Sequence, residues 1–114
     1  ALKRAYAFIE AGADAIMIHS CERKPDEILE FCDTFRKKDK KTPIVVVPTS
    51  YNGITEQELI AHGVNLVIYA NQLIRSAFPA IKKTAEDILH YHRAKEVDDR
   101  LMPVKEIISL IDEI

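Results

Sequence analysis

The sequence predicts an α/β fold in which helices alternate with parallel strands. Three short runs, 15–19, 43–48 and 65–70, are almost wholly apolar and rich in β-branched residues. Runs of this length without in–out alternation are typical of parallel strands buried on both faces. The segments between them carry apolar residues at helical spacing, which predicts a helix in each crossover. Only three glycines occur in 114 residues, which argues against an all-β fold rich in tight turns.

Residues that typically begin and end helices agree with this alternation. Gly12 and Gly63 follow the first and third helical segments, where a residue of left-handed conformation often ends a helix. Pro25 is expected to open the second helix. Thr55 and Glu58 have the spacing of a capping box, which predicts the start of the third helix.

After the third strand we expect two terminal helices, at 72–92 and 103–113, joined by a charged, solvated connection. Residues 10–19 and 61–70 form a weak repeat of helix end, glycine and buried strand. Repeated units of this kind build barrels and doubly wound sheets. A (β/α)8 barrel takes roughly 250 residues, so three strands account for only part of one. We therefore expect the C-terminal part, about the last three β/α units, of a (β/α)8 TIM barrel.

Composition and charge exclude several classes of function. A net charge of −2 argues against a nucleic-acid-binding protein, which is usually strongly basic. No apolar run reaches the roughly 20 residues of a transmembrane helix, so we expect no membrane partner. Cys21 and Cys32 match neither a redox motif nor a zinc-ligand set, and two free thiols favour a cytoplasmic location. No cluster of carboxylates follows the strands, so we expect no metal ligand within this chain.

Polar residues follow each predicted strand: His19 and Ser20 the first, Thr49 the second and Asn71 the third. Ligands of parallel α/β proteins bind at the carboxyl ends of the strands, so these four are candidate site residues. His19 can act as a general acid–base or donate to an anion, or it can cap its strand by bonding to nearby backbone. Ser20 and Thr49 can donate to phosphate or carboxylate oxygens, or cap their loops. Asn71 either lines the site or is the N-cap of the long helix.

Five segments occur in an order that carries a resemblance. They are 1–20 with the motif Gly-Ala-Asp-Ala and the pair His-Ser, 25–31, 46–51 reading Val-Val-Pro-Thr-Ser-Tyr, 63–75 and 104–108. Together they resemble the phosphoenolpyruvate mutase family of the isocitrate lyase superfamily, over essentially the whole chain. The Gly-Ala-Asp-Ala motif alone is common to many barrels, whereas five segments in order are specific.

The resemblance implies an isomerase that interconverts phosphoenolpyruvate and phosphonopyruvate, forming a carbon–phosphorus bond in phosphonate biosynthesis. It implies that His19 contacts the transferring phosphoryl group, and that Ser20, Thr49 and Asn71 line the substrate site. The family binds Mg2+ with its substrate, and the resemblance places the metal ligands upstream of this chain. The 114-residue chain alone is then expected to be inactive. It also implies a homodimer or homotetramer that exchanges the last barrel helix, here 71–92.

Three alternatives remain open at this point. The related phosphonopyruvate hydrolase transfers the same phosphoryl group to water, and other isocitrate lyase-superfamily enzymes share the barrel. The chain can also be a non-catalytic α/β binding or assembly module. One departure bears on the subfamily: the residue after His-Ser is often lysine in the family and is Cys21 here.

Overall fold

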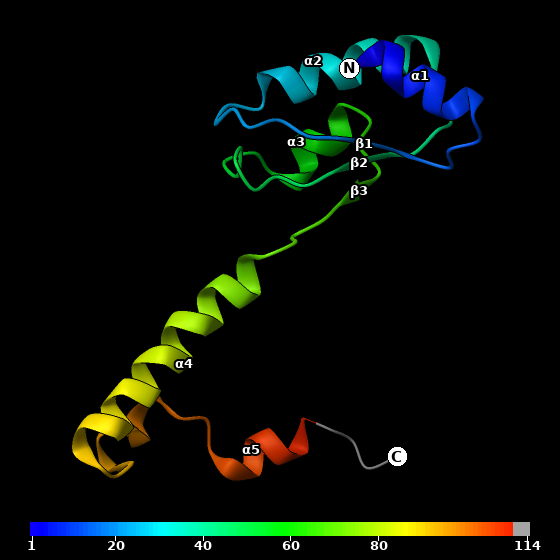
Figure 1. Cartoon of the computed structure of the whole chain (residues 1–114). Coiled ribbons are helices and arrows are strands. Elements are labelled where there is room, and N and C mark those ends of the chain that lie inside the picture. The colour runs from blue at the N-terminus through cyan, green and yellow to red at the C-terminus, as the bar shows by residue number, and fades with distance from the viewer. Residues whose placement is uncertain (111–114) are drawn as a thin grey trace. The chain divides into compact units, whose positions relative to one another are not determined.

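The computed structural model describes residues 1–110. The chain divides into two compact units, Ala1–Asn71 and the part from Gln72 onward (Figure 1). The first unit alternates helices and strands in the order α1 Leu2–Glu10, β1 Ile16–Ile18, α2 Asp26–Lys38, β2 Ile44–Val46, α3 Glu56–Ala61 and β3 Leu66–Val67. The second unit consists of α4 Gln72–Tyr91, the 3-10 helix η1 Lys95–Arg100 and α5 Val104–Ser109.

The three strands form one parallel sheet in the order β1-β2-β3. The last row of paired residues crosses the sheet as Ile18, Val46 and Val67. The strands are shorter than the apolar runs 15–19, 43–48 and 65–70 that predicted them. Pro48 has no N–H to donate, which limits how far β2 can extend its ladder. The prediction of a parallel α/β arrangement is confirmed.

The face of the sheet toward the helices carries the core. Ile44 and Val46 of β2 are fully buried there, together with Phe35 of α2. The Phe35 ring stacks on Tyr6 of α1 at 5.5 Å and on Phe31 at 5.6 Å between ring centroids. Figure 1 shows α1 and α2 over this face. The other core members are Ala5, Ile16, Ile28, Cys32, Tyr51, Leu59 and Val64.

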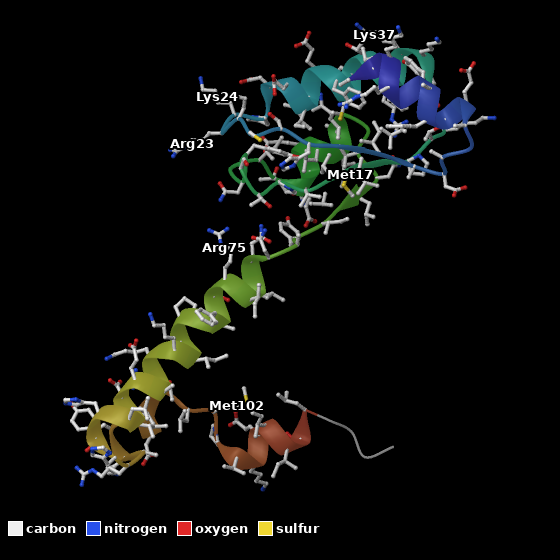
Figure 2. The ribbon with its side chains drawn as sticks, in the orientation of Figure 1. Met17, Arg23, Lys24, Lys37, Arg75 and Met102 are labelled. Carbon is white, nitrogen blue, oxygen red and sulfur yellow. The ribbon has the colours of Figure 1, made fainter. Side chains whose placement is uncertain are left out.

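The opposite face of the sheet is only partly covered within residues 1–110, so burial of the strands on both faces stays a prediction for a full barrel. Met17, Val45 and Leu66 pair across the sheet as one row. Met17 is 59% exposed and Leu66 52%, whereas Val45, flanked on both sides, is 8% exposed. Figure 2 shows Met17 on the side of the sheet away from α1 and α2. The apolar strands therefore present a second apolar face, which α1 and α2 do not cover.

Local signals at the helix ends act as the sequence predicted. Gly12 and Gly63 have positive φ angles of 99° and 83° after α1 and α3. Thr55 Oγ1 accepts from the Glu58 N–H at 3.3 Å, and the Glu58 carboxylate accepts from the Thr55 N–H at 2.8 Å. A Cβ at Gly63 would lie 2.7 Å from Nε of Arg36, so space as well as backbone angle requires glycine there.

Arg36 of α2 holds together the two loops that enter β2 and β3. Its guanidinium donates to the Gly63 carbonyl at 3.0 and 2.8 Å, to the Thr42 carbonyl at 2.8 Å and to the Asp39 carbonyl at 3.2 Å. It also donates at 2.7 Å to Asn65 Oδ1, which accepts a further bond from the first amide of β2 at 2.9 Å. One side chain thus fixes the amino edge of the sheet, meaning the side where the strands begin.

The second unit is a long helix with a short return. None of the residues of α4 is buried, and Leu73 is 82% exposed. The connection predicted to be solvated is partly packed, because η1 buries Val97 completely. Arg100 secures this return by donating to Asp87 of α4 at 2.6 Å. The charged residues of η1 predicted a solvated segment, whereas in the structure they surround the buried Val97.

The predicted final helix, 103–113, corresponds to α5, and its residues 111–113 lie outside the described part of the chain. The predicted helix 72–92 ends at Tyr91, because His92 adopts a positive φ of 54° that terminates α4. No helix within residues 1–110 combines the length and apolar character needed to span a membrane.

Candidate functional site

The candidate residues come from the edge at which all three strands end. Because the strands are parallel, their carboxyl ends lie along one side of the sheet. His19 follows β1 directly, Thr49 lies in the loop after β2, and Asn71 lies between β3 and α4. This carboxyl edge is where ligands of parallel α/β proteins bind.

The His19 side chain has no hydrogen-bond partner within residues 1–110. It is exposed and lines a cavity of about 460 Å³ between the start of α1 and the first half of α2. Lys3, Glu27 and Glu30 supply charged groups to the same cavity. Within residues 1–110 the imidazole makes no hydrogen bond to nearby backbone or to another side chain. Its role as an acid–base group or as a donor to an anion stays a prediction.

Ser20 faces the protein instead. It is 6% exposed, and its hydroxyl donates to Oε2 of Glu27 at 2.5 Å. The Ser20 Oγ in turn accepts from the N–H of Glu22 at 3.1 Å. The structure therefore supports the alternative in which Ser20 caps its loop. Sequence analysis did not select Glu27, although an acidic residue in the first turn of a helix seven positions after a serine was a usable signal.

Thr49 is half-buried in the loop that follows β2. Its N–H donates to the Val47 carbonyl at 2.8 Å, while its hydroxyl bonds to none of the described residues. Tyr51, two residues further on, is fully buried and packs in the core, so it anchors this loop to the body of the unit. Burial raises the pKa of the Tyr51 phenol, which keeps it neutral. Its role as an anchor was not predicted.

Asn71 is the last residue before α4 begins, which is the position of an N-cap. It takes part in an interaction, and its capping and site-lining roles both stay predictions. The loop after β1 also carries two exposed basic residues, Arg23 and Lys24 (Figure 2). With Cys21 they line a second cavity of about 520 Å³. Glu22, Asp26 and Glu27 line the same cavity, so this part of the carboxyl edge carries charges of both signs.

No group of three or more His, Cys, Asp or Glu side chains in residues 1–110 is arranged to hold a metal ion. The donor set of this region does not fit a divalent-metal site, for which several oxygen ligands must converge. The buried Cys32 thiol is not an available ligand either, because burial raises its pKa to about 11. At the carboxyl edge, His19 and Thr49 can donate hydrogen bonds to a ligand.

Comparison with known proteins identifies the family. The model of the phosphoenolpyruvate phosphomutase family matches residues 1–89. The chain belongs to this family. Its match to the family model takes in α1, all three strands and most of α4, and so includes all four candidate residues.

Individual relatives carry two different names. The chain is 44% identical over 111 residues to the phosphonopyruvate hydrolase of Variovorax sp. (strain Pal2), covering 96% of this chain and 37% of that protein. A solved phosphoenolpyruvate phosphomutase from Streptomyces platensis subsp. rosaceus matches with a TM-score of 0.85 and 36% identity, covering 96% of this chain and 37% of that one. A phosphonopyruvate hydrolase structure with oxalate and Mg2+ matches with a TM-score of 0.82 and 44% identity, covering 96% of this chain and 38% of that one.

The chain thus spans little more than a third of the length of these relatives. Over that span the fold prediction is confirmed: the chain contributes three parallel β/α units of the barrel seen in a phosphoenolpyruvate phosphomutase. The family resemblance found in the sequence is confirmed as well.

Proposed function

We propose that this chain is the C-terminal part of an enzyme that breaks and forms the carbon–phosphorus bond of phosphonopyruvate. As a mutase, the whole protein interconverts phosphonopyruvate and phosphoenolpyruvate. The observation that carries the proposal is the exposed His19 at the carboxyl edge, in a chain that matches a phosphoenolpyruvate phosphomutase along 96% of its length.

The chemistry assigns a distinct task to this edge. In phosphonopyruvate the phosphoryl group leaves the methylene carbon, and in the mutase direction it bonds to the enolate oxygen of the same molecule. Negative charge spreads over the phosphoryl oxygens during transfer, so fixed donors aimed at them lower the barrier. His19 is the proposed catalytic donor, and Thr49 and Asn71 are proposed substrate-lining residues.

Hydrolysis is the second candidate, and a specific observation favours it. Identity to the phosphonopyruvate hydrolase is 44%, against 36% to the solved mutase. In a hydrolase the same phosphoryl group transfers to water, which yields phosphate and pyruvate. The two activities share the carbon–phosphorus cleavage and differ only in the acceptor.

Phosphorus NMR of the full-length protein with phosphonopyruvate separates these candidates. A phosphoenolpyruvate signal supports the mutase, whereas a free phosphate signal, with an equal amount of pyruvate measured by proton NMR, supports the hydrolase. If neither product forms in the presence of Mg2+, the proposed chemistry is wrong and a non-catalytic or different lyase role takes its place. Adding a chelator to the active enzyme tests the metal requirement, because we propose that Mg2+ is bound by residues upstream of this chain.

We further propose that the full-length protein is a cytoplasmic homodimer or homotetramer that associates through α4. Two free cysteines support the location, and a helix without buried residues supports the association. Apolar side chains along α4 are exposed to 82% at Leu73, 62% at Phe78 and 73% at Leu89. Sedimentation of the full-length protein at the mass of a single subunit would rule this assembly out.

A further inference from the structure

Ser20 and Glu27 form a linked pair directly behind His19. Ser20 is almost fully buried, whereas its neighbour His19 is exposed. The 2.5 Å bond from the Ser20 hydroxyl to Glu27 joins the residue after His19 to the first turn of α2. The Glu22 N–H, donating to the same hydroxyl at 3.1 Å, closes the intervening loop.

This bond uses the whole donor capacity of Ser20. A hydroxyl has a single proton, and here it lies between Ser20 and a carboxylate, so none remains for a substrate oxygen. Hydrogen bonds to a carboxylate are shorter and stronger than neutral ones. Glu27 is itself held favourably, because an acidic side chain in the first turn of a helix interacts with the positive end of the helix dipole. The rigid partner is therefore α2, and the loop is the part being held.

Glu27 also lies between the two cavities of the carboxyl edge. It lines the cavity that contains His19 and the cavity that contains Cys21, Arg23 and Lys24. Between β1 and α2 the chain has no regular structure, so the direction of the His19 side chain depends on how this loop is anchored.

We propose that Ser20 and Glu27 are positioning residues that fix the loop after β1 and thereby aim the His19 imidazole. The proposal rests on the catalytic role proposed above for His19. Ser20 then acts through His19 and does not bind substrate directly. A displacement of about 1 Å in a catalytic group can cost up to about 100-fold in rate, so a single anchoring bond can matter greatly.

A double-mutant cycle in the full-length protein tests this proposal. Ser20→Ala removes the donor and Glu27→Ala the acceptor, and each should lower kcat by about 10- to 100-fold with little change in KM. The kcat of the double variant should be no lower than that of the less active single variant, because both changes break the same hydrogen bond. Glu27→Gln keeps an acceptor oxygen, so it should lose less activity than Glu27→Ala.

Asp33→Ala is the matched control. Asp33 lies further along α2, is exposed, and contacts His62 at 2.7 Å near the amino edge, and it does not line the cavity that contains His19. Its replacement removes the same charge from the same helix without touching the loop after β1. We expect Asp33→Ala to keep the wild-type kcat.

NMR signals of the His19 ring provide a readout that is independent of activity. They should shift in Ser20→Ala and Glu27→Ala but not in Asp33→Ala. Unchanged His19 signals in the first two variants, or a fall in Tm alone, would overturn the positioning role. So would a rise in KM confined to Ser20→Ala, which would mean direct substrate contact. If the wild-type protein acts on neither phosphonopyruvate nor phosphoenolpyruvate, the proposed function is wrong. The NMR signals of the His19 ring still test whether Ser20 and Glu27 position that side chain.

Discussion

The two edges of the sheet differ in how their polar side chains are used. At the amino edge, the Arg36 guanidinium donates hydrogen bonds to four backbone and side-chain acceptors from two loops. At the carboxyl edge, the side chains of His19 and Thr49 bond to no described residue. Ser20 is the exception there, because its bond to Glu27 serves the loop.

This difference separates stability from chemistry within a small unit. Side chains with all their hydrogen bonds satisfied internally hold the fold, and side chains with free capacity can meet a ligand. Barrel enzymes generally divide their two ends in this way, with catalytic groups at the carboxyl ends of the strands. Substitutions at the two edges should therefore have separable effects on stability and on turnover.

The largest effect is expected at the amino edge. Arg36→Ala should destabilise the full-length protein by about 2–4 kcal/mol, because three half-buried carbonyls lose a charged donor at once. The measurement is chemical denaturation, with Lys37→Ala as the matched control. Lys37 is the adjacent residue and is exposed, as Figure 2 shows, so its loss should change little. An equal loss of stability in both variants would show that Arg36 is not the support of this edge.

A comparable loss, but of turnover, is expected at the carboxyl edge. His19→Ala in the full-length enzyme should lower kcat by about 100-fold, as the removal of one transition-state donor does, with Tm unchanged. His62→Ala provides the contrast, since His62 lies at the end of α3 near the amino edge and its Nδ1 contacts Asp33 at 2.7 Å. It should keep full turnover. Wild-type turnover in His19→Ala would make that residue structural only.

The smallest effect concerns pH and sharpens the description of the amino edge. Asp39 accepts from the Lys41 N–H at 2.8 Å and from the N–H and hydroxyl of Thr42 at 2.8 and 2.7 Å. The hydrogen bonds from Thr42 and Lys41 hold the pKa of Asp39 below its usual value of 3.8. A lowered folded-state pKa stabilises the protein above the unfolded-state value, and this contribution is lost as the pH falls through the folded-state value.

Asp39→Asn should therefore be less stable than the wild type near pH 7, and the difference should shrink once the pH falls below about 3.8. Thermal unfolding across this pH range provides the measurement. Asp14→Asn is the control, because Asp14 makes no hydrogen bond within residues 1–110. A difference that persists unchanged into strong acid would mean that the carboxylate is not the stabilising group.

Local features of the fold could be predicted from the sequence. The left-handed positions of Gly12 and Gly63 and the capping box at Thr55 depend on residues close in the chain, so their spacing alone specifies them. Strand positions followed from apolar runs for the same reason. The exposed row that includes Met17 did not, because coverage of a face depends on other parts of the barrel.

The site was predictable only as a location. Parallel strands imply a shared carboxyl edge, which placed His19 and Thr49 correctly without any contact being known. Whether a hydroxyl is free or internally bonded depends on a partner brought by folding, as with Ser20 and Glu27. The Arg36 hub was missed for that reason too, since Gly63 and Asn65 lie 27 and 29 positions away in the chain.

The partly bare row of Met17, Val45 and Leu66 has a consequence for how this sequence can vary. Side chains on the helix side touch neighbours within the first unit, so a change there can be offset by another change nearby. In a closed barrel, side chains of this row meet those of other strands, and tight packing couples their volumes. Substitutions at these three positions should therefore be correlated with substitutions at residues distant in the sequence. The correlation should be strongest for Val45, at the centre of the row.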